Sequence, residues 1–585
     1  MNARWPRWAS PFIAVLALAS SAVGIVNRFT YDDRYIIELN PIMRSLQGWW
    51  RVFQGSYWPK DWGGDGYRPL TILAFKLESV ASGRNPMLFH AVNIALYVVV
   101  CVLVFALAKR FLPVWAAWIT AALFAVHPVH VEAVANVVGQ AELVVAAALI
   151  SATLLYVRDR QSGALQLKTV AIVALLYTIA CFSKEHGIVL PAILVAAEFT
   201  IIEDETPWRD RIRGVRPFFL FLTAIALAFI WARSLVLADH GGIGGFQPFT
   251  PFSTLHISGR DRVLTAIGVV PQWVRLLFWP AHLSSEYGPP EIEIAQGYSL
   301  TQLPGLIVLL SILGIGIAVR RGQPVISFGV GVTCITLLPS SNFLLAAGIV
   351  LAERTLLLPS VGAMLIVGAS AVHAADALRS QFANRRRAYV IGIAIVSAAI
   401  VAGMTRSIAR TRVWRDNDTL FRHAVADSPR GYRAHYMLGA WNFENKRKRD
   451  GEAEYRKALN LFPYDPFLSY NMAEQYRITG LCSAALPLYR WTFGLDSAFP
   501  LGHTAYSWCL LHEGQYDDAR AKALDAMRYG GDYGLLRQII AVADSARGAK
   551  KSAVSMPGLA RGAPSKVPDS LQKAGQKVGG GLSSR

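Results

Sequence analysis

Long apolar segments joined by short polar turns constrain the fold of this chain more than any other feature. A helix of about 20 apolar residues is long enough to cross a bilayer. Hydrophobic residues make up 53% of the 585 residues and charged residues only 17%, a composition typical of polytopic membrane proteins. The chain is therefore predicted to be an all-α membrane protein with about eleven transmembrane helices. The segments cover residues 8–26, 88–108, 113–130, 140–157, 168–182, 187–203, 216–237, 301–319, 324–340, 349–372 and 388–405.

One further apolar run, residues 263–280, contains Arg275 and several tryptophans, so we interpret it as a re-entrant or interfacial segment. The charge pattern favours this interpretation. With eleven spans and the N-terminus in the cytoplasm, every cytoplasmic turn is basic, as the positive-inside rule requires. These turns are Lys109-Arg110, 158–168, 209–216, Arg320-Arg321 and 385–387.

This orientation predicts which segments share the outer face of the membrane. They are the first loop, residues 27–87, the segments 127–136, 183–187, 238–262 and 281–300, and everything after about residue 406. The net charge of +19 would also suit a nucleic-acid partner, but the basic residues are explained by topology, so none is predicted. Membrane lipid is the expected partner. The predicted location is a bacterial inner membrane, with the C-terminal region periplasmic or otherwise extracytoplasmic.

The region after residue 405 has an internal repeat of 34 residues. Pro429 and Pro463 are separated by this period, and small residues recur with it at Gly439, Ala473 and Ser507. This is the period of tetratricopeptide (TPR) repeats, in which stacked helix pairs form a concave groove. We predict helix pairs beginning near residues 432, 466 and 500, which either bind a protein or pack as a structural cap.

The domain prediction follows from these patterns. Residues 1–405 form the transmembrane domain, residues 406–546 the TPR domain, and residues 547–585 a disordered basic tail rich in Gly, Ser and Lys. The TPR domain contains Cys482 and Cys509, which could pair, although buried free thiols are the expected state.

Two adjacent carboxylates, Asp32 and Asp33, follow the first apolar segment in the stretch FTYDDRYIIELNP. Neighbouring carboxylates repel, so one of them holds a proton more tightly. Such a group suits general-base chemistry on a hydroxyl. The alternatives are a solvated pair at a helix end, or an N-cap for the helix that follows.

A second candidate lies in the outer segment HPVHVEAVAN, which contains His127, His130 and Glu132. The HxxH spacing on a helix could bind a metal with Glu132 as third ligand, although the intervening proline disturbs the register. The same side chains could instead hydrogen-bond a phosphate or sugar, or form a structural turn. Glu142 lies at the start of the next apolar segment.

Charged residues at the ends of other spans are candidates because ionisable groups near a membrane are costly and usually functional. Lys184, Glu185 and Arg354 lie at such ends, and Arg68 lies near the end of the first outer loop. The cations could hold a phosphate. The alternatives are structural ion pairs, Lys184 with Glu185 and Glu353 with Arg354, and an interfacial anchor for Arg68.

Several segments, taken in order, resemble the transmembrane-and-TPR O-mannosyltransferase family, a branch of the GT-C superfamily of membrane glycosyltransferases. The resemblance covers roughly residues 20 to 535. The segments are YDDRYIIELNP, YRPLTILAF, NPMLFHAVNIALY, ALFAVHPVHVEAVANVVGQAELV, FSKEHGIVLPAILVAAE, LSSEYGPPEI, AERTLLLPS and VWRDNDTLFRHAVADSP.

The resemblance implies a GT-C-like fold and an inverting transfer of a sugar, mannose or another hexose. The donor is a polyprenyl-phosphate sugar and the acceptor a hydroxyl, such as Ser or Thr of an exported protein. The acidic motif of such enzymes corresponds to Asp32 as base, with Asp33 supporting it. The expected donor contacts are His127, His130, Glu132, Lys184, Glu185, Arg354 and Arg68. No cofactor is required, and a divalent metal remains an alternative.

Two other functions compete with this interpretation. A non-catalytic scaffold would use the repeats to bind an envelope partner, and a transporter would need charges near the membrane centre rather than at span ends. Walker A, GxSxG, HExxH and Rossmann motifs are missing from the sequence, which argues against an ATP-driven pump or a soluble-type hydrolase.

Overall fold

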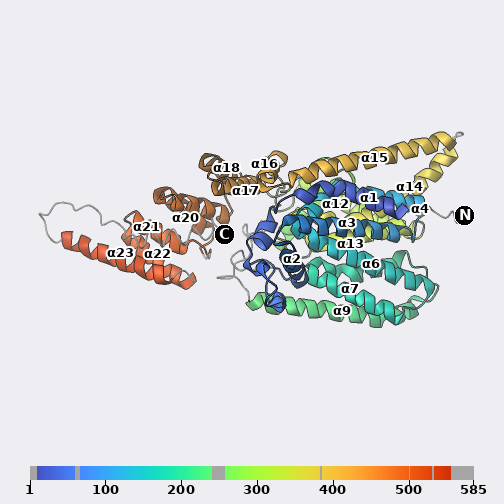
Figure 1. Cartoon of the computed structure of the whole chain (residues 1–585), viewed down its shortest axis with the longest axis horizontal. Coiled ribbons are helices and arrows are strands. Elements are labelled where there is room, and N and C mark those ends of the chain that lie inside the picture. The colour runs from blue at the N-terminus through green and yellow to red at the C-terminus, as the bar shows by residue number, and fades with distance from the viewer. Residues whose placement is uncertain are drawn as a thin grey trace. The chain divides into compact units, whose positions relative to one another are not determined.

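The computed structural model describes residues 9–59, 66–239, 257–381, 385–497, 499, 501–529 and 533–554. Every regular element in these ranges is a helix, and the described part contains no strand (Figure 1). Contacts divide the chain into two compact units. Unit 1 contains the described residues up to 288 and residues 292–428, and unit 2 contains residues 289–291 and the described residues from 429 onward.

Within the described residues of unit 1, seven helices are long and apolar enough to cross a membrane, or eight if a bent pair counts as one span. This confirms the prediction of an all-α polytopic membrane protein. The seven are α1 with η1 (Ala9–Val26), α3 (Pro86–Ala108), η7 with α6 (Val137–Ser162), α9 (Trp208–Asp239), η9 with α12 (Leu300–Ala318), α14 (Pro359–Gln381) and α15 (Arg385–Val413).

The bent pair joins α4 (Val114–Ala125) to η6 (Pro128–His130) and α5 (Val131–Ala135) at an angle of 47°. The bend falls at Pro128, which lacks the N–H that would continue the helix. Three other predicted spans correspond to shorter helices: α7 (Leu167–Ser183), α8 (Leu190–Thr200) and α13 (Pro324–Leu337). The count of eleven and the orientation therefore stay predictions, as does the interfacial role of α11 (Gly259–Phe278).

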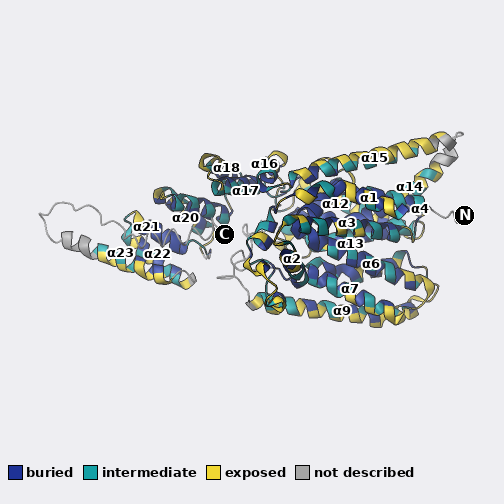
Figure 2. Ribbon diagram, in the orientation of Figure 1, coloured by how far each residue is buried: buried dark blue, intermediate teal, exposed yellow. Residues whose placement is uncertain are grey.

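Burial separates central helices from peripheral ones (Figure 2). In the most apolar stretch of the span formed by η7 and α6, 78% of the residues are buried. The corresponding share is 11% for α9 and for the span formed by η9 and α12, and 6% for α15. The exposed residues of α9 and α15 include many large apolar side chains, such as Leu220, Trp231 and Ile395. An apolar outer surface of this kind suits contact with lipid acyl chains.

The first loop, residues 27–87, folds into short helices with their own core. They are η2 (Arg34–Glu38, a π-helical turn), η3 (Pro41–Arg44), η4 (Trp49–Gln54) and α2 (Pro69–Ser82). Ile36, Ile37 and Tyr57 from the loop pack with Phe75 of α2 and Phe89 of α3. The loop after the first span is therefore a packed layer that holds its polar residues in defined positions.

Unit 2 consists of helix pairs that pack on one another. The pairs are α17 (Tyr432–Glu444) with α18 (Lys448–Leu461), α19 (Pro466–Ile478) with α20 (Cys482–Leu495), and α21 (His503–His512) with α22 (Tyr516–Ala526), followed by α23 (Tyr533–Val554). A Cβ atom at Gly439 would lie 2.9 Å from the Tyr455 ring, so this small residue permits the close crossing of α17 and α18. The TPR assignment itself remains a prediction.

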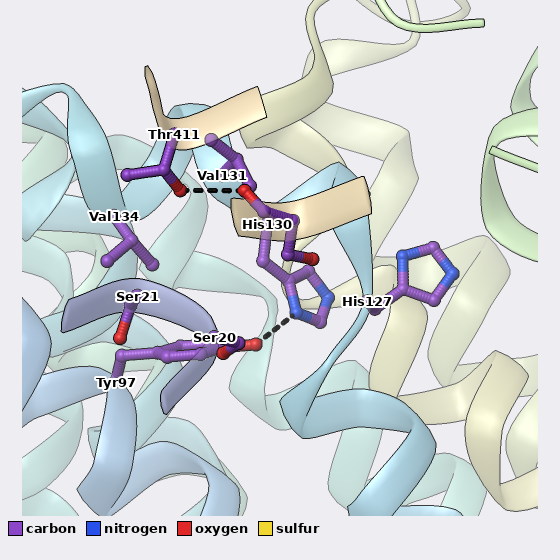
Figure 3. Close-up of a pocket in the computed structure, with 9 residues that line it drawn as sticks. Ser20, Ser21, Tyr97, His127, His130, Val131, Val134 and Thr411 are labelled. Atoms are coloured by element: carbon purple, nitrogen blue, oxygen red, sulfur yellow. Dashed lines mark hydrogen bonds between the residues drawn. The ribbon is translucent and has the colours of Figure 1, made fainter. Parts of the chain in front are cut away.

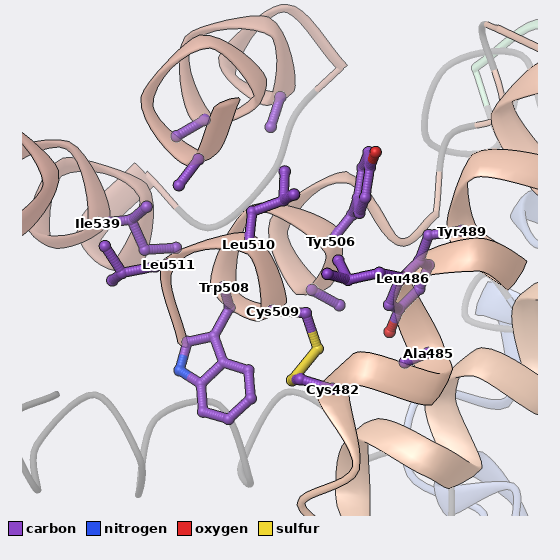
Figure 4. Close-up of a cluster of buried hydrophobic side chains, with 14 of the residues drawn as sticks. Cys482, Ala485, Leu486, Tyr489, Tyr506, Trp508, Cys509, Leu510, Leu511 and Ile539 are labelled. Atoms are coloured by element: carbon purple, nitrogen blue, oxygen red, sulfur yellow. A yellow bond between two sulfur atoms is a disulfide. The ribbon is translucent and has the colours of Figure 1, made fainter. Parts of the chain in front are cut away.

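The structure corrects one expectation for unit 2. Cys482 and Cys509, expected as free thiols, form a disulfide between α20 and α21 (Figure 4). Both lie in a buried cluster with Tyr489, Trp508 and Leu536, so the crosslink joins two consecutive helix pairs through their core. Helix α23 extends to Val554. The remainder of the predicted tail, residues 555–585, lies outside the described residues.

Candidate active site

The polar residues predicted from four separate segments gather in unit 1 around Asp32 and Arg354. The Arg354 Nη2 atom lies 3.9 Å from Oδ2 of Asp32, and Nη1 lies 2.5 Å from Oε1 of Glu132. The backbone N–H of Arg354 also donates to Oε2 of Glu132, at 3.0 Å. The side chains of Asp32 and Arg354 are 20% and 18% exposed, whereas that of Glu132 is 2% exposed. Asp32 and Arg354 thus form the accessible edge of a buried ionic network.

Asp33 has a different environment from its neighbour, because it is 0% exposed. Its carboxylate accepts hydrogen bonds from the backbone N–H groups of Val137, Val138 and Thr30, at 3.1, 2.8 and 3.2 Å. Burial raises the pKa of Asp33 to about 8, although the three N–H donors oppose that shift. Asp33 is the first residue before η2, but its side chain makes no N-cap hydrogen bond there. It instead ties the first loop to the turn that follows α5.

The two histidines lie inside the bundle and have protein partners. His130 contacts the Tyr97 hydroxyl through Nδ1 at 2.9 Å and the Ser360 hydroxyl through Nε2 at 2.8 Å. His127 Nε2 lies 3.0 Å from the carbonyl oxygen of Leu277. Figure 3 shows the His130 ring directed toward Tyr97 in a small pocket that His127 also lines. Both rings are buried, so neither faces the accessible edge at Asp32.

Lys184 forms an ion pair with Glu142, which begins α6. His186 Nε2 lies 3.1 Å from the other carboxylate oxygen of Glu142. Burial lowers the pKa of Lys184, and the nearby charges of Arg68 and Arg354 lower it further. These three cations are therefore close enough to repel one another. A polyanion such as a phosphate would relieve that repulsion.

Arg68, from the first loop, forms an ion pair with Glu185, from the segment that follows α7. The Arg68 Nε atom lies 2.9 Å from Oε2 of Glu185, and its guanidinium lies 4.3 Å from the centre of the Tyr57 ring. The backbone N–H of Tyr67 donates to Glu185 at 3.3 Å. Although burial opposes the shift, the charges of Arg68 and Lys184 help to lower the pKa of Glu185 to about 2. Glu185 is therefore an anion that orients Arg68.

Ion pairs do form in this group, but their partners differ from the predicted structural pairs. Lys184 pairs with Glu142 rather than with Glu185, and Arg354 pairs with Glu132 rather than with Glu353. On a turn, the side chains of adjacent residues point in different directions. Lys184 and Arg354 therefore pair with carboxylates from segments that are distant along the chain.

Two glycines bring the loops of this group close to their supporting helices. A Cβ atom at Gly139 would clash with the carbonyl oxygen of Ala133, and one at Gly187 would lie 2.5 Å from the carbonyl carbon of Ala180. Both contacts are with backbone, which cannot move aside as a side chain can. The turns that present Glu132, Glu142 and Lys184 therefore depend on glycine at these positions.

Within the described residues, no His, Cys, Asp and Glu side chains gather in a group of three or more that could hold a metal ion. His127 and His130 in particular bond to other protein groups. The site's positive charge comes from arginine and lysine.

Comparison with known proteins identifies similar chains. No protein-family model matches. A protein O-mannosyl-transferase of Caenorhabditis elegans is 26% identical over 450 residues, which cover 74% of this chain and 60% of that protein. The human protein O-mannosyl-transferases TMTC1 and TMTC4 are each 26% identical, over 78% and 77% of this chain and 55% and 66% of their own lengths. The chain is a relative of the transmembrane-and-TPR O-mannosyltransferases. It spans about 55–66% of the length of these three relatives.

The site also includes Arg410, which the sequence did not single out, and Glu353, for which the sequence offered only a structural pair with Arg354. Glu353 is fully buried and accepts hydrogen bonds from the Ser284 N–H and the Tyr287 hydroxyl, each at 2.6 Å. Arg410, at the end of α15, lies 3.8 Å from Glu353 and 2.8 Å from Asp427. These contacts hold Glu353, and with it the adjacent Arg354. The available signal for Arg410 was an arginine shortly after the last apolar segment.

Proposed function

We propose that this protein is a membrane glycosyltransferase. It would transfer a sugar, mannose or another hexose, from a polyprenyl-phosphate donor to a hydroxyl acceptor such as Ser or Thr of an exported protein. The observation that carries the proposal is an accessible carboxylate, Asp32, beside Arg354 at the edge of an ionic network. The names of the similar proteins support the same reaction class.

In this proposal Asp32 is the base and Asp33 is structural. The Asp32 side chain is 20% exposed and lies 3.9 Å from Arg354, so an acceptor hydroxyl can reach its carboxylate. Asp33 already accepts three backbone hydrogen bonds and has no exposed surface. A general base must come within hydrogen-bond reach of the proton that it removes.

The proposed reaction is a direct displacement. The acceptor hydroxyl transfers its proton to the Asp32 carboxylate while its oxygen forms a bond to the anomeric carbon. The bond between that carbon and the phosphate oxygen breaks, and its electron pair leaves with the polyprenyl phosphate. Attack from the side opposite the leaving group inverts the anomeric configuration. Asp32 then releases its proton to solvent.

The leaving phosphate requires positive charge near the position where its own charge develops. Arg354, Lys184 and Arg68 are the proposed contacts, because each lies at a loop end and contacts the same network. Glu132, Glu142 and Glu185 hold these cations in position. His127 and His130 are buried among protein partners, so in this proposal they support the fold rather than the donor.

We further propose that unit 2 lies on the outer, extracytoplasmic side. Disulfides persist in oxidising compartments, and Cys482–Cys509 is such a bond. In intact cells or spheroplasts, an external protease should cleave unit 2. Protection of unit 2 until the membrane is lysed would contradict this orientation.

The test of the catalytic proposal is to replace Asp32 by Asn and to measure transfer from a tritium-labelled polyprenyl-phosphate mannose to a Ser- and Thr-rich peptide. Loss of a general base typically costs about 10²- to 10⁴-fold in rate. Asp418→Asn is the matched control, because Asp418 forms an exposed ion pair with Arg422 on α16 (Asn417–Asp427). Unchanged transfer in the Asp32→Asn protein, with normal membrane insertion, would refute the assignment.

The alternative is a non-catalytic scaffold that binds an envelope partner through unit 2. The separate compactness of unit 2 is the observation that favours it. A scaffold would tolerate Asp32→Asn but lose function when exposed unit 2 residues such as Tyr464 and Trp491 are replaced by Ala.

A further inference from the structure

The residue before Asp32 has an unusual backbone conformation. Tyr31 has a φ angle of 55°, in the left-handed region that glycine adopts most easily. A residue with a side chain costs roughly 1–2 kcal/mol there. It persists only where its surroundings fix it, and such residues cluster at functional sites.

Both ends of Tyr31 are held. Its backbone N–H donates to Oδ1 of Asn417 at 2.8 Å, and its hydroxyl donates to Oε1 of Glu286 at 2.6 Å. Its ring packs edge-on against Trp414, with the ring centres 6.5 Å apart. Two segments far apart in the sequence, at residue 286 and at residues 414–417, therefore converge on this one tyrosine.

The two hydrogen-bond acceptors are themselves fixed. Asn417 is 6% exposed and begins α16, whose N-cap residue Asp416 accepts a hydrogen bond from the Thr419 N–H at 2.9 Å. The backbone N–H of Glu286 donates to the Ser284 hydroxyl at 3.1 Å, and its carbonyl accepts from the Ser428 hydroxyl at 2.8 Å. The anchors of Tyr31 thus belong to the packed interior of unit 1.

The residues before Tyr31 are held by the same region of the chain. The Asn27 side chain donates to the Thr411 carbonyl at 3.2 Å, and the Arg28 N–H donates to the Arg415 carbonyl at 2.9 Å. The second bond joins two backbone groups, so it does not depend on the side chains of Arg28 and Arg415. The segment that leads to Asp32 therefore lies along the end of α15.

The residue on the other side of Asp32 is held as well. The Asp33 carboxylate accepts hydrogen bonds from the Val137 and Val138 N–H groups. Asp32 is therefore the accessible residue between two fixed neighbours.

We infer that Tyr31 is a positioning residue, which Asn417 and Glu286 hold so that the Asp32 carboxylate faces the acceptor hydroxyl. The inference rests on the proposed function. It adds that the orientation of Asp32 depends on the residues at the junction of α15 and α16. Tyr31 acts through Asp32 and needs no contact with the sugar.

The test compares Tyr31→Phe, which keeps the ring but removes the hydroxyl, with Asn417→Ala and Asn417→Asp in the full chain. The assay is mannose transfer from polyprenyl-phosphate mannose to a Ser- and Thr-rich peptide. We expect Tyr31→Phe and Asn417→Ala to lower kcat about 10- to 100-fold, as misplacement of a reacting group does. The KM for the donor should stay unchanged, and Asn417→Asp, which retains an acceptor oxygen, should keep its activity.

Asn445→Ala is the matched control, because the Asn445 side chain makes an exposed hydrogen bond to the Trp441 carbonyl in unit 2. The inference is overturned if Tyr31→Phe and Asn417→Ala behave like this control, or if Asn417→Asp loses as much activity as Asn417→Ala. Asp32→Asn separates the two proposals. If it is inactive while the Tyr31 and Asn417 variants are normal, only the inference fails, whereas an active Asp32→Asn protein refutes the proposed base itself.

A second measurement does not depend on turnover or on the stability of one variant. The Asp32→Cys protein is labelled with a membrane-impermeant thiol reagent, with and without Asn417→Ala. We expect the labelling rate to change several-fold when Asn417 is replaced, because the side chain at position 32 is then free to turn. An unchanged rate in folded protein would overturn the inference.

Discussion

Two clusters of charged side chains lie at opposite ends of α6, and they differ in how fully their charges are neutralised. The stretch of helix between Glu142 and Arg160 is about 27 Å long. Near the start of α6, Glu142 joins the network of Lys184, Arg354 and Asp32. Near its end, Arg160 lies 2.7 Å from both Glu198 and Asp204, in a second network.

The carboxylates of the second network are closely paired: Asp204, whose side chain is 17% exposed, lies 2.7 Å from Arg160. Arg211 lies 2.6 Å from Glu198, and the side chains of Arg160, Glu198 and Arg211 are each less than 10% exposed. The Tyr156 hydroxyl donates to Glu198 as well, at 2.6 Å. The first network has an accessible edge at Asp32. Charge at the end of a span is therefore not enough to indicate function. The two networks differ in how closely the partly exposed carboxylate is paired with an arginine, at 2.7 Å for Asp204 and 3.9 Å for Asp32.

The largest expected effect is on stability at the second network. Glu198→Ala leaves Arg160 and Arg211 without their shared carboxylate, and breaking a buried pair typically costs about 3–5 kcal/mol. The melting temperature in detergent should fall, while transfer activity per folded molecule should stay normal. A specific loss of activity at full stability would contradict the contrast between the two networks.

A smaller effect concerns the pH dependence of stability. Hydrogen bonds from Thr206, with the help of Arg160, lower the pKa of Asp204, whereas burial raises the pKa of Asp33 to about 8. The folded state therefore binds the Asp33 proton more tightly than the unfolded state does. The contribution of this bound proton to the free energy of unfolding is fully present below about pH 4. It is lost as the pH rises from about 4 through 8, by at most about 1.4 kcal/mol per pH unit.

The measurement is the melting temperature of the wild type and of Asp33→Asn between about pH 6 and pH 8.5, a window that spans the raised pKa. The wild type should lose stability over this range, and the variant, which carries no titrating carboxyl at position 33, should lose less. Asp418→Asn should retain the wild-type slope. Equal slopes in wild type and Asp33→Asn would show that Asp33 does not titrate in this range.

The smallest expected effect is Arg354→Lys at the accessible edge. Lysine keeps the charge but lacks the fork that lets arginine contact Glu132 and approach Asp32 together. We expect a decrease of about tenfold in transfer rate, a loss of roughly 1.4 kcal/mol in transition-state stabilisation. Arg321→Lys, in the exposed turn after α12, is the control. A rate equal to that of the control would remove Arg354 from the proposed site.

The sequence predicted the all-helical membrane fold and the segments that form the site, because apolar length and charge at span ends are local properties. Asp32, Lys184 and Arg354 do lie in one network. Their ion-pair partners were not predictable, since Glu132 and Arg354 are brought together only by tertiary packing. The Cys482–Cys509 disulfide was missed for the same reason, because no spacing rule joins two cysteines in different helix pairs.

The backbone contacts at Gly139 and Gly187 have a consequence for how such a site can diversify. Neither position tolerates even a methyl group without moving main chain, so the loops that carry Glu142 and Lys184 have little freedom to drift as sequences diverge. Changes of donor or acceptor preference in this architecture would then arise through exchange of side chains on a nearly invariant framework. A substitution scan should find these glycines intolerant of change although neither one contacts a substrate.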